Sequence, residues 1–254
     1  MEHSHARAVP DRPGPTVVMV PGLGLDARSW QRVRDRLTGD HRVVLLPSMG
    51  RPAPASTDLR VERQAGRLLD ELQAHQVGAA ILVGHSAGCA VAAEAAAQSS
   101  VVVGLVLIGP VTDPRGRSWP AMVLRWVRTA THERAWEAAV LLPQYLSCGL
   151  PTMLRSMDVV RRYAIAEALA RITVPVVVVR GSRDRIAPHD WAADLVRPAD
   201  RSLVTAAGSG HLVPLTEPAA VVHAVDRVTA SLASAPWPPD QLRSAEPPDA
   251  QGSL

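Results

Sequence analysis

The chain has 254 residues, of which 47% are hydrophobic and 20% charged, as in soluble globular proteins. No apolar run reaches the roughly 18 residues that span a bilayer. Residues 1–15 also lack the apolar core of a signal peptide, so we expect a cytoplasmic protein without a membrane partner. The net charge is only +3 and no dense basic run is present, which argues against a nucleic-acid partner.

Short apolar runs alternate with helical patterns between residues 16 and 234. The runs are nearly continuous, which predicts parallel strands buried on both faces, at 16–20, 42–46, 80–83, 104–108, 174–180 and 202–205. The segments between them predict helices at 29–37, 59–75, 86–98, 189–196 and 218–231. This alternation indicates one α/β domain over residues 16–234, with a sheet of about six strands. The Pro-rich, polar composition of 1–15 and 235–254 predicts disordered termini.

Residues 112–171 break this rhythm, because they contain no strand pattern. So long a connection without regular structure is uncommon in a compact domain, and apolar residues recur through it at helical spacing. We therefore expect a helical insertion over the carboxyl edge of the sheet, where open α/β sheets bind their ligands. Its aromatic residues either line an acyl pocket or pack the helices together. Trp119 and Trp126 are the candidates for substrate binding, beside Trp136 and Tyr145.

The sequence Gly-His-Ser-Ala-Gly, residues 84–88, lies where a predicted strand turns into a predicted helix. One explanation is a helix-capping serine in a turn of small residues. The other is a nucleophile, Ser86, held on a strained elbow whose neighbours must be small. Because a serine hydroxyl is a weak nucleophile, the second explanation requires a base and a group that orients the base.

Two later loops supply such groups. His211, in GSGHLVPLTEP, follows the last predicted strand, and Asp184, in RGSRDRIAP, follows the strand at 174–180. Parallel strands end at the same edge of a sheet, so we expect Ser86, Asp184 and His211 to meet there. A turn-capping role for Asp184 and a surface-loop position for His211 are the alternatives.

The loop after the first strand, VPGLGLDARSW, is the candidate oxyanion hole. The backbone N–H groups of Leu23 and Ala87 would together hold an oxyanion that forms on a reacting carbonyl. Gly22 and Gly24 would let the backbone approach that carbonyl closely.

The four motifs PGLG (21–24), GHSAG (84–88), GSRDRIAP (181–188) and GSGHLVPLTEP (208–218) together resemble the α/β-hydrolase superfamily. The resemblance implies an α/β-hydrolase fold with a helical lid at about 112–171. It also implies a serine hydrolase of carboxylesterase type, with no cofactor and no metal, in which Ser86, Asp184 and His211 are catalytic. Many relatives carry His-Gly where this chain has Pro21-Gly22, which puts the support of the oxyanion loop in doubt more than its N–H donors.

In this interpretation, a small acyl substrate with an ester, lactone or thioester carbonyl forms an acyl-enzyme that water cleaves. The alternatives are a non-hydrolytic enzyme of the same fold (a lyase, cyclase or perhydrolase) and a ligand-binding receptor on the same scaffold. Asp113 competes with Asp184 as the acid, because some relatives carry it after an earlier strand; the loop match favours Asp184. His85 is expected to pack behind the nucleophile, and Cys89 to be a small buried side chain.

The insertion is strongly basic. Residues 115–171 hold nine Arg and only four acidic residues. A solvated helix face is one explanation, and an anionic substrate or an acidic carrier protein docked on the lid is the other.

Overall fold

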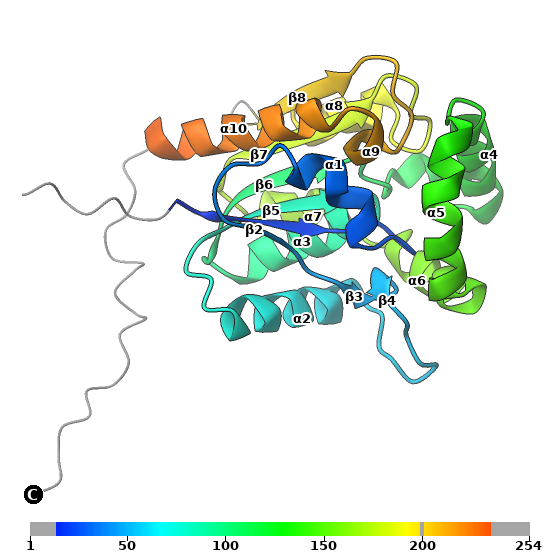
Figure 1. Ribbon diagram of the computed structural model, residues 1–254, viewed down its shortest axis with the longest axis horizontal. Helices are drawn as coiled ribbons and strands as arrows, with labels where there is room; N and C mark the ends of the chain where they lie inside the picture. The colour runs from blue at the N-terminus through cyan, green and yellow to red at the C-terminus, as the bar shows by residue number, and fades with distance from the viewer. Residues whose placement is uncertain (1–13, 199–200, 235–254) are drawn as a thin grey trace, which may run out of the picture.

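The computed structural model describes residues 14–198 and 201–234, and a six-stranded sheet runs through it (Figure 1). The strand order is β2-β1-β5-β6-β7-β8, and all neighbouring strands are parallel. This confirms the predicted sheet. The strands are β1 (Thr16–Val20), β2 (His41–Val43), β5 (Ala80–His85), β6 (Val102–Ile108), β7 (Val176–Gly181) and β8 (Arg201–Ala206). The terminal segments expected to be disordered lie outside the described residues, apart from Gly14 and Pro15.

The second predicted strand, 42–46, is wrong in extent. β2 ends at Val43, and the chain then folds back into a small two-stranded ladder of β3 (Leu46–Pro47) and β4 (Gly50–Arg51). β3 and β4 pair in parallel across a tight loop, where Ser48 (67°) and Gly50 (91°) have positive φ angles that hydrophobic periodicity does not predict. The helix predicted at 29–37 is likewise shorter. It comprises a 3-10 turn, η1 (Ala27–Trp30), and α1 (Gln31–Arg34).

Helices cover both faces of the sheet, and each face has its own apolar core. One face packs against α1 and α10 (Pro218–Ser234). The other packs against α2 (Val61–Ala74), α3 (Gly88–Gln98), α7 (Ile165–Ala170) and α8 (His189–Leu195). Burial on both sides explains why β1, β5, β6 and β7 read as unbroken apolar runs.

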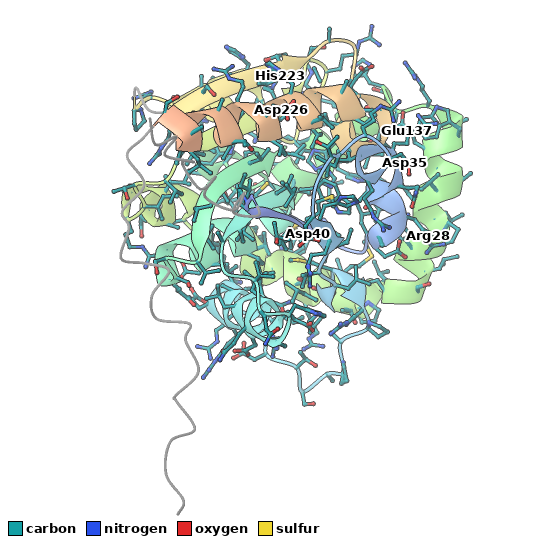
Figure 2. All side chains as sticks on the ribbon, turned by 60° about the vertical axis from the view of Figure 1, so that its left-hand side comes forward. Arg28, Asp35, Asp40, Glu137, His223 and Asp226 are labelled. Carbon is teal, nitrogen blue, oxygen red and sulfur yellow. The ribbon has the colours of Figure 1, made fainter. Side chains whose placement is uncertain are left out.

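The two helices in closest contact with the sheet approach it over small residues. α3 is rich in alanine, and its residues from Gly88 to Ala95 are all buried. On the other face, α10 sits so close to β6 that a Cβ at Gly104 would overlap Cγ1 of Val228. His223 and Asp226 lie on the exposed side of α10 (Figure 2).

The predicted helical insertion follows β6 and the 3-10 turn η2 (Pro114–Gly116). It consists of α4 (Trp119–Ala130), α5 (Ala135–Cys148) and α6 (Leu150–Val160), which stand together at one end of the sheet (Figure 1). Leu141 of α5 packs against Leu25, in the loop after β1, and against Leu212 and Leu215, at the start of and within the short helix α9 (Val213–Thr216) after β8. The Asp26 N–H also donates to the side-chain oxygen of Gln144 (2.7 Å). The insertion therefore rests on the carboxyl edge, as expected, whereas α7 leaves it to pack on α3.

The insertion exposes many apolar side chains beside its arginines. In the part of the chain that the structure describes, all large exposed hydrophobic side chains lie on α4, α5 and α6: Trp119, Val123, Leu124, Trp126, Val127, Leu142, Leu146, Leu150 and Leu154. No helix among the described residues is long and apolar enough to cross a membrane.

The contact between Gly104 and Val228 gives a test of this packing. We expect Gly104→Ala to lower the free energy of unfolding by about 1–3 kcal/mol, because the added methyl group has no room against α10. Gly66→Ala on α2 is the control, since a Cβ there meets nothing within 4 Å. It should stabilise the helix by roughly 0.5–1 kcal/mol. Urea denaturation checks both variants, and equal shifts in the two would contradict the close contact.

Candidate active site

Ser86 occupies a strained turn between β5 and α3. Its φ is +54°, a left-handed conformation that serine rarely adopts, and its backbone N–H donates to the Ile108 carbonyl (2.8 Å). Glycines on both sides make the turn possible. A Cβ at Gly84 would lie 2.6 Å from the Gly88 oxygen, and one at Gly88 would lie 2.6 Å from the carbonyl oxygens of Val20 and Pro21. α3 begins without a side-chain cap, so Ser86 is not a capping serine.

Ser86, His211 and Asp184 form one chain of hydrogen bonds. The His211 ring joins Oγ of Ser86 through Nε2 (2.9 Å) and Oδ2 of Asp184 through Nδ1 (2.8 Å). If Nδ1–H donates to the carboxylate, Nε2 is left free to accept the hydroxyl proton of the serine. The three residues follow β5, β8 and β7, so the strand order alone brings them to one edge.

Asp184 is fully buried, and its loop is built to hold a carboxylate. Oδ1 accepts the backbone N–H groups of Ile186 (2.8 Å) and Ala187 (3.1 Å). Behind the loop, the buried Arg180 donates to the carbonyls of Ala187 (3.0 Å) and Asp184 (3.1 Å). Burial works against the charged form, but His211 and these N–H groups lower the pKa of Asp184 overall.

Asp113, the competing acid, serves another purpose. Its buried carboxylate binds Arg115 (Oδ1–Nε, 3.0 Å) and Arg125 (Oδ2–Nη1, 2.7 Å) and caps η2. The hydrogen bond to the His211 ring comes from Asp184 instead. Of the two acids that the sequence offered, Asp184 is the one in position.

Two histidines lie against each other in the site, with opposite tendencies to ionise. Burial disfavours the charged form of His211, yet the Asp184 carboxylate and, more weakly, Glu133 raise its pKa above the ordinary value. Burial lowers the pKa of His85 to about 3, so its ring is neutral. The His85 Nε2 lies 3.0 Å from the His211 backbone carbonyl, to which it donates as a neutral ring. His85 therefore supports the histidine loop from behind.

The expected oxyanion donors are adjacent to Ser86. A Cβ at Gly22 would lie 3.1 Å from the Ser86 Cβ, so the loop after β1 runs directly beside the serine. Leu23 and Ala87 are buried, and their N–H groups find no acceptor among residues 14–198 and 201–234. Buried N–H groups are almost always paired, so two open ones beside a serine hydroxyl are free to donate hydrogen bonds to a ligand oxygen.

Two further polar side chains reach the site from the insertion. Cγ of Glu133 lies 3.5 Å from where a Cβ of Gly210 would be, and its carboxylate has no hydrogen-bond partner within the described residues. The Tyr145 ring lies against Gly24, and burial, with Glu133 nearby, raises the pKa of Tyr145 to about 12. Glu133 lies outside every sequence motif, and Arg180, although it begins the stretch RGSRDRIAP, carries no pattern that predicts its contacts with the carbonyl groups of that loop.

The tryptophans predicted to bind substrate take no part in these contacts. Trp119 and Trp126 are 36% and 56% exposed on α4, and Trp119 lies 5.4 Å from the Arg161 guanidinium. Their role in binding stays a prediction. Trp136 packs with Tyr145 beside Leu141 in the insertion's own contact with the sheet edge. Cys89 is buried as expected, and burial raises the pKa of its thiol. No cluster of three metal-ligating side chains occurs in the part described.

The sequence of the chain matches a known protein family. The model of the Alpha/beta hydrolase family matches residues 17–224. The chain belongs to the alpha/beta hydrolase family. One similar protein is the "Putative carbamate hydrolase RutD" of Stutzerimonas stutzeri (strain A1501), which is 24% identical to this chain over 247 residues. The match covers 84% of this chain and 91% of the relative. The magnesium-chelatase 30 kDa subunit of Rhodobacter capsulatus is 26% identical over 235 residues, or 79% and 81%.

A solved structure with a similar fold is Est816, described as an N-acyl homoserine lactone degrading enzyme. It superposes on this chain with a TM-score of 0.71 at 18% sequence identity. The match covers 84% of this chain and 93% of the Est816 chain. At that identity the likeness shows a shared fold.

The pKa values of His85 and His211, which are shifted in opposite directions, can be measured by NMR of ¹⁵N-labelled imidazoles. We expect the pKa of His211 to lie above its ordinary value of about 6.5, while His85 stays neutral throughout the titration. Glu133→Gln should lower the pKa of His211, because a neighbouring carboxylate no longer stabilises the imidazolium. Glu62→Gln, at an exposed position on α2, is the matched control. An unchanged His211 pKa in Glu133→Gln would show that the carboxylate lies too far away to act.

Proposed function

We propose that the protein is a serine hydrolase that cleaves a carboxylic ester, lactone or thioester through an acyl-enzyme. The observation that carries the proposal is the hydrogen-bonded series Ser86–His211–Asp184, next to two buried N–H groups that have no acceptor in the part of the chain that the structure describes. A nucleophile, a base, a group that orients the base and an oxyanion site are the complete set of parts for acyl transfer.

In the first half of the reaction, Oγ of Ser86 attacks the carbonyl carbon while Nε2 of His211 takes the hydroxyl proton. The carbonyl oxygen becomes an oxyanion and accepts hydrogen bonds from the N–H groups of Leu23 and Ala87. As the intermediate collapses, His211 passes its proton to the leaving oxygen or sulfur. Asp184 keeps the ring in one tautomer and stabilises its charged form.

In the second half, water replaces the leaving group. His211 takes a proton from the water as it attacks the acyl-enzyme carbonyl, and then returns that proton to Oγ of Ser86. Glu133 stands beside the same histidine loop, and the Tyr145 ring stands beside the oxyanion loop. They are the groups available on the insertion to hold a polar part of the substrate.

The relatives support a carbonyl substrate without defining it. A lactone-degrading enzyme shares the fold, and a relative named for carbamate hydrolysis shares 24% of the sequence. A second candidate is a non-hydrolytic role on the same fold. It is favoured by the relative that is 26% identical to this chain and is named as a subunit of magnesium chelatase. A lyase, a cyclase, a perhydrolase or a ligand-binding receptor would fall under this second candidate.

The test is active-site labelling with a fluorophosphonate, combined with turnover of short and long p-nitrophenyl esters. We expect the wild type to be labelled and active, and Ser86→Ala and His211→Ala to lose labelling and roughly 10⁴-fold or more in turnover. His223→Ala, which changes an exposed histidine of α10 outside the hydrogen-bonded series, is the control and should be labelled and active. Tight binding of a carbonyl ligand without turnover, unaffected by Ser86→Ala, would instead favour the second candidate.

The pH profile of kcat/KM gives an independent check. His211 acts as a base only when neutral, so activity should fall with decreasing pH through a midpoint above the ordinary value of about 6.5. Asp184→Asn removes the carboxylate that raises this pKa and leaves burial, which lowers it; the midpoint should therefore move to lower pH. The plateau rate should fall by about 10⁴-fold, because the ring loses its preferred tautomer. A midpoint that does not move would show that another group limits the rate.

A further inference from the structure

A cleft lies at the contact between α4 and the loop that follows β7, the loop that also carries Asp184. Its volume is about 490 Å³, within the range of small-molecule sites. The cleft lies where the insertion contacts the core. A hydrogen bond joins the two parts there, because Oγ1 of Thr129 on α4 accepts the backbone N–H of Arg185 (3.1 Å). Its lining residues are Arg125, Arg128, Thr131, His132, Arg185 and Pro188.

The lining of this cleft is basic without any carboxylate. Three arginines and a histidine face it, whereas two other clefts of the molecule include Asp158 among their lining residues. The guanidinium groups of Arg128 and Arg185 have no ion-pair or hydrogen-bond partner in the described part of the chain. Exposed arginines elsewhere, such as Arg60 and Arg197, pair with an aspartate close by in the sequence.

Arg125, which also lines the cleft, has a side chain fixed by its neighbours. Its Nη1 binds Oδ2 of Asp113 (2.7 Å), and the guanidinium packs so tightly on Gly116 that a Cβ there would lie 2.5 Å from Nη1. Asp113 also binds Arg115 (3.0 Å), which pairs in addition with Asp190 on α8. The positive charge of the cleft therefore comes from Arg128 and Arg185, and they lie next to the Arg125 guanidinium, whose position is fixed before any ligand arrives.

We propose that this cleft binds the phosphoryl group of a small ligand. Guanidinium groups match the tetrahedral oxygens of phosphate with paired, charge-assisted hydrogen bonds. Three of them, with His132 and the Thr131 hydroxyl at the rim, suit a dianion better than a single carboxylate. Bound there, the phosphoryl group removes the repulsion between Arg128 of the insertion and Arg185 of the core, and it ties these two parts together.

The phosphoryl group has two sources with the same chemistry: free phosphate, or a phosphorylated acyl substrate. The second source rests on the proposed function. It would place the phosphorylated end of a thioester next to Arg185, the residue that follows Asp184 in the chain. The cleft would then select substrates by their phosphorylated handle, while Ser86 acts on the acyl end.

Binding of inorganic phosphate to the full chain tests the site without any need for activity. We expect phosphate, compared with chloride at equal ionic strength, to raise the Tm of the wild type, and calorimetry to give a saturable isotherm. Arg128→Gln/Arg185→Gln should weaken phosphate affinity by about tenfold or more, because two charge-assisted donors are lost. Arg227→Gln, an exposed arginine on α10, is the matched control and should bind like the wild type.

Equal phosphate binding by all three proteins, or no binding by the wild type, would overturn the proposal. A change in fold is excluded as the cause if the double variant without phosphate is at least as stable as the wild type. We expect this result, since the substitutions remove like charges that face each other across the cleft.

Kinetics with two thioesters show whether the bound phosphoryl group belongs to the substrate or is free phosphate. The two are acetyl-coenzyme A and the acetyl thioester of N-acetylcysteamine, which lacks phosphate. If the substrate supplies the group, the double variant raises KM about tenfold or more for the first thioester and leaves the second unchanged. If free phosphate is the ligand, both KM values stay unchanged while phosphate binding is lost. Either outcome supports the site. Absence of turnover with both thioesters would count against the proposed function and leave the binding result standing.

Discussion

The left-handed backbone of Ser86 is the constraint on which the rest of the site depends. A φ of +54° at a residue with a side chain is unfavourable, so the surrounding structure must hold it. Here the Ile108 carbonyl holds the Ser86 N–H, and α3 lies on the sheet so closely that only glycine fits at positions 84 and 88. The alanine-rich sequence of α3 follows from this approach, because larger side chains would lift the helix away from β5.

A second layer of support stands behind the ionisable groups. Arg180 is buried with only carbonyl oxygens as partners, and two of these belong to the loop that presents Asp184. His85 plays a corresponding part for the histidine loop through the His211 carbonyl. Both residues act on backbone and not on the reacting atoms, so they fix the distances between Ser86, His211 and Asp184 without taking part in proton transfer.

Much of this could be predicted from the sequence, because it depends on local rules. Parallel strands buried on both faces leave continuous apolar runs, and short loops after such strands have to meet at one edge, which predicted that Ser86, Asp184 and His211 meet. The end of β2 and the positions of Glu133 and Tyr145 could not be predicted in the same way. The first depends on two positive φ angles, and the others on how the insertion docks, which helical periodicity does not determine.

The insertion differs from the sheet in how it is stabilised. In α4, Thr129 alone is fully buried, whereas eight consecutive residues of α3 are. Little apolar surface is exposed when such a helix detaches, so its opening free energy lies at the low end of the molecule's range. Amide hydrogen exchange along α4 would then be fast while that of β5 and β6 stays slow. The persistence of the fold therefore depends on the sheet and on α3, and α4 can open locally without unfolding them.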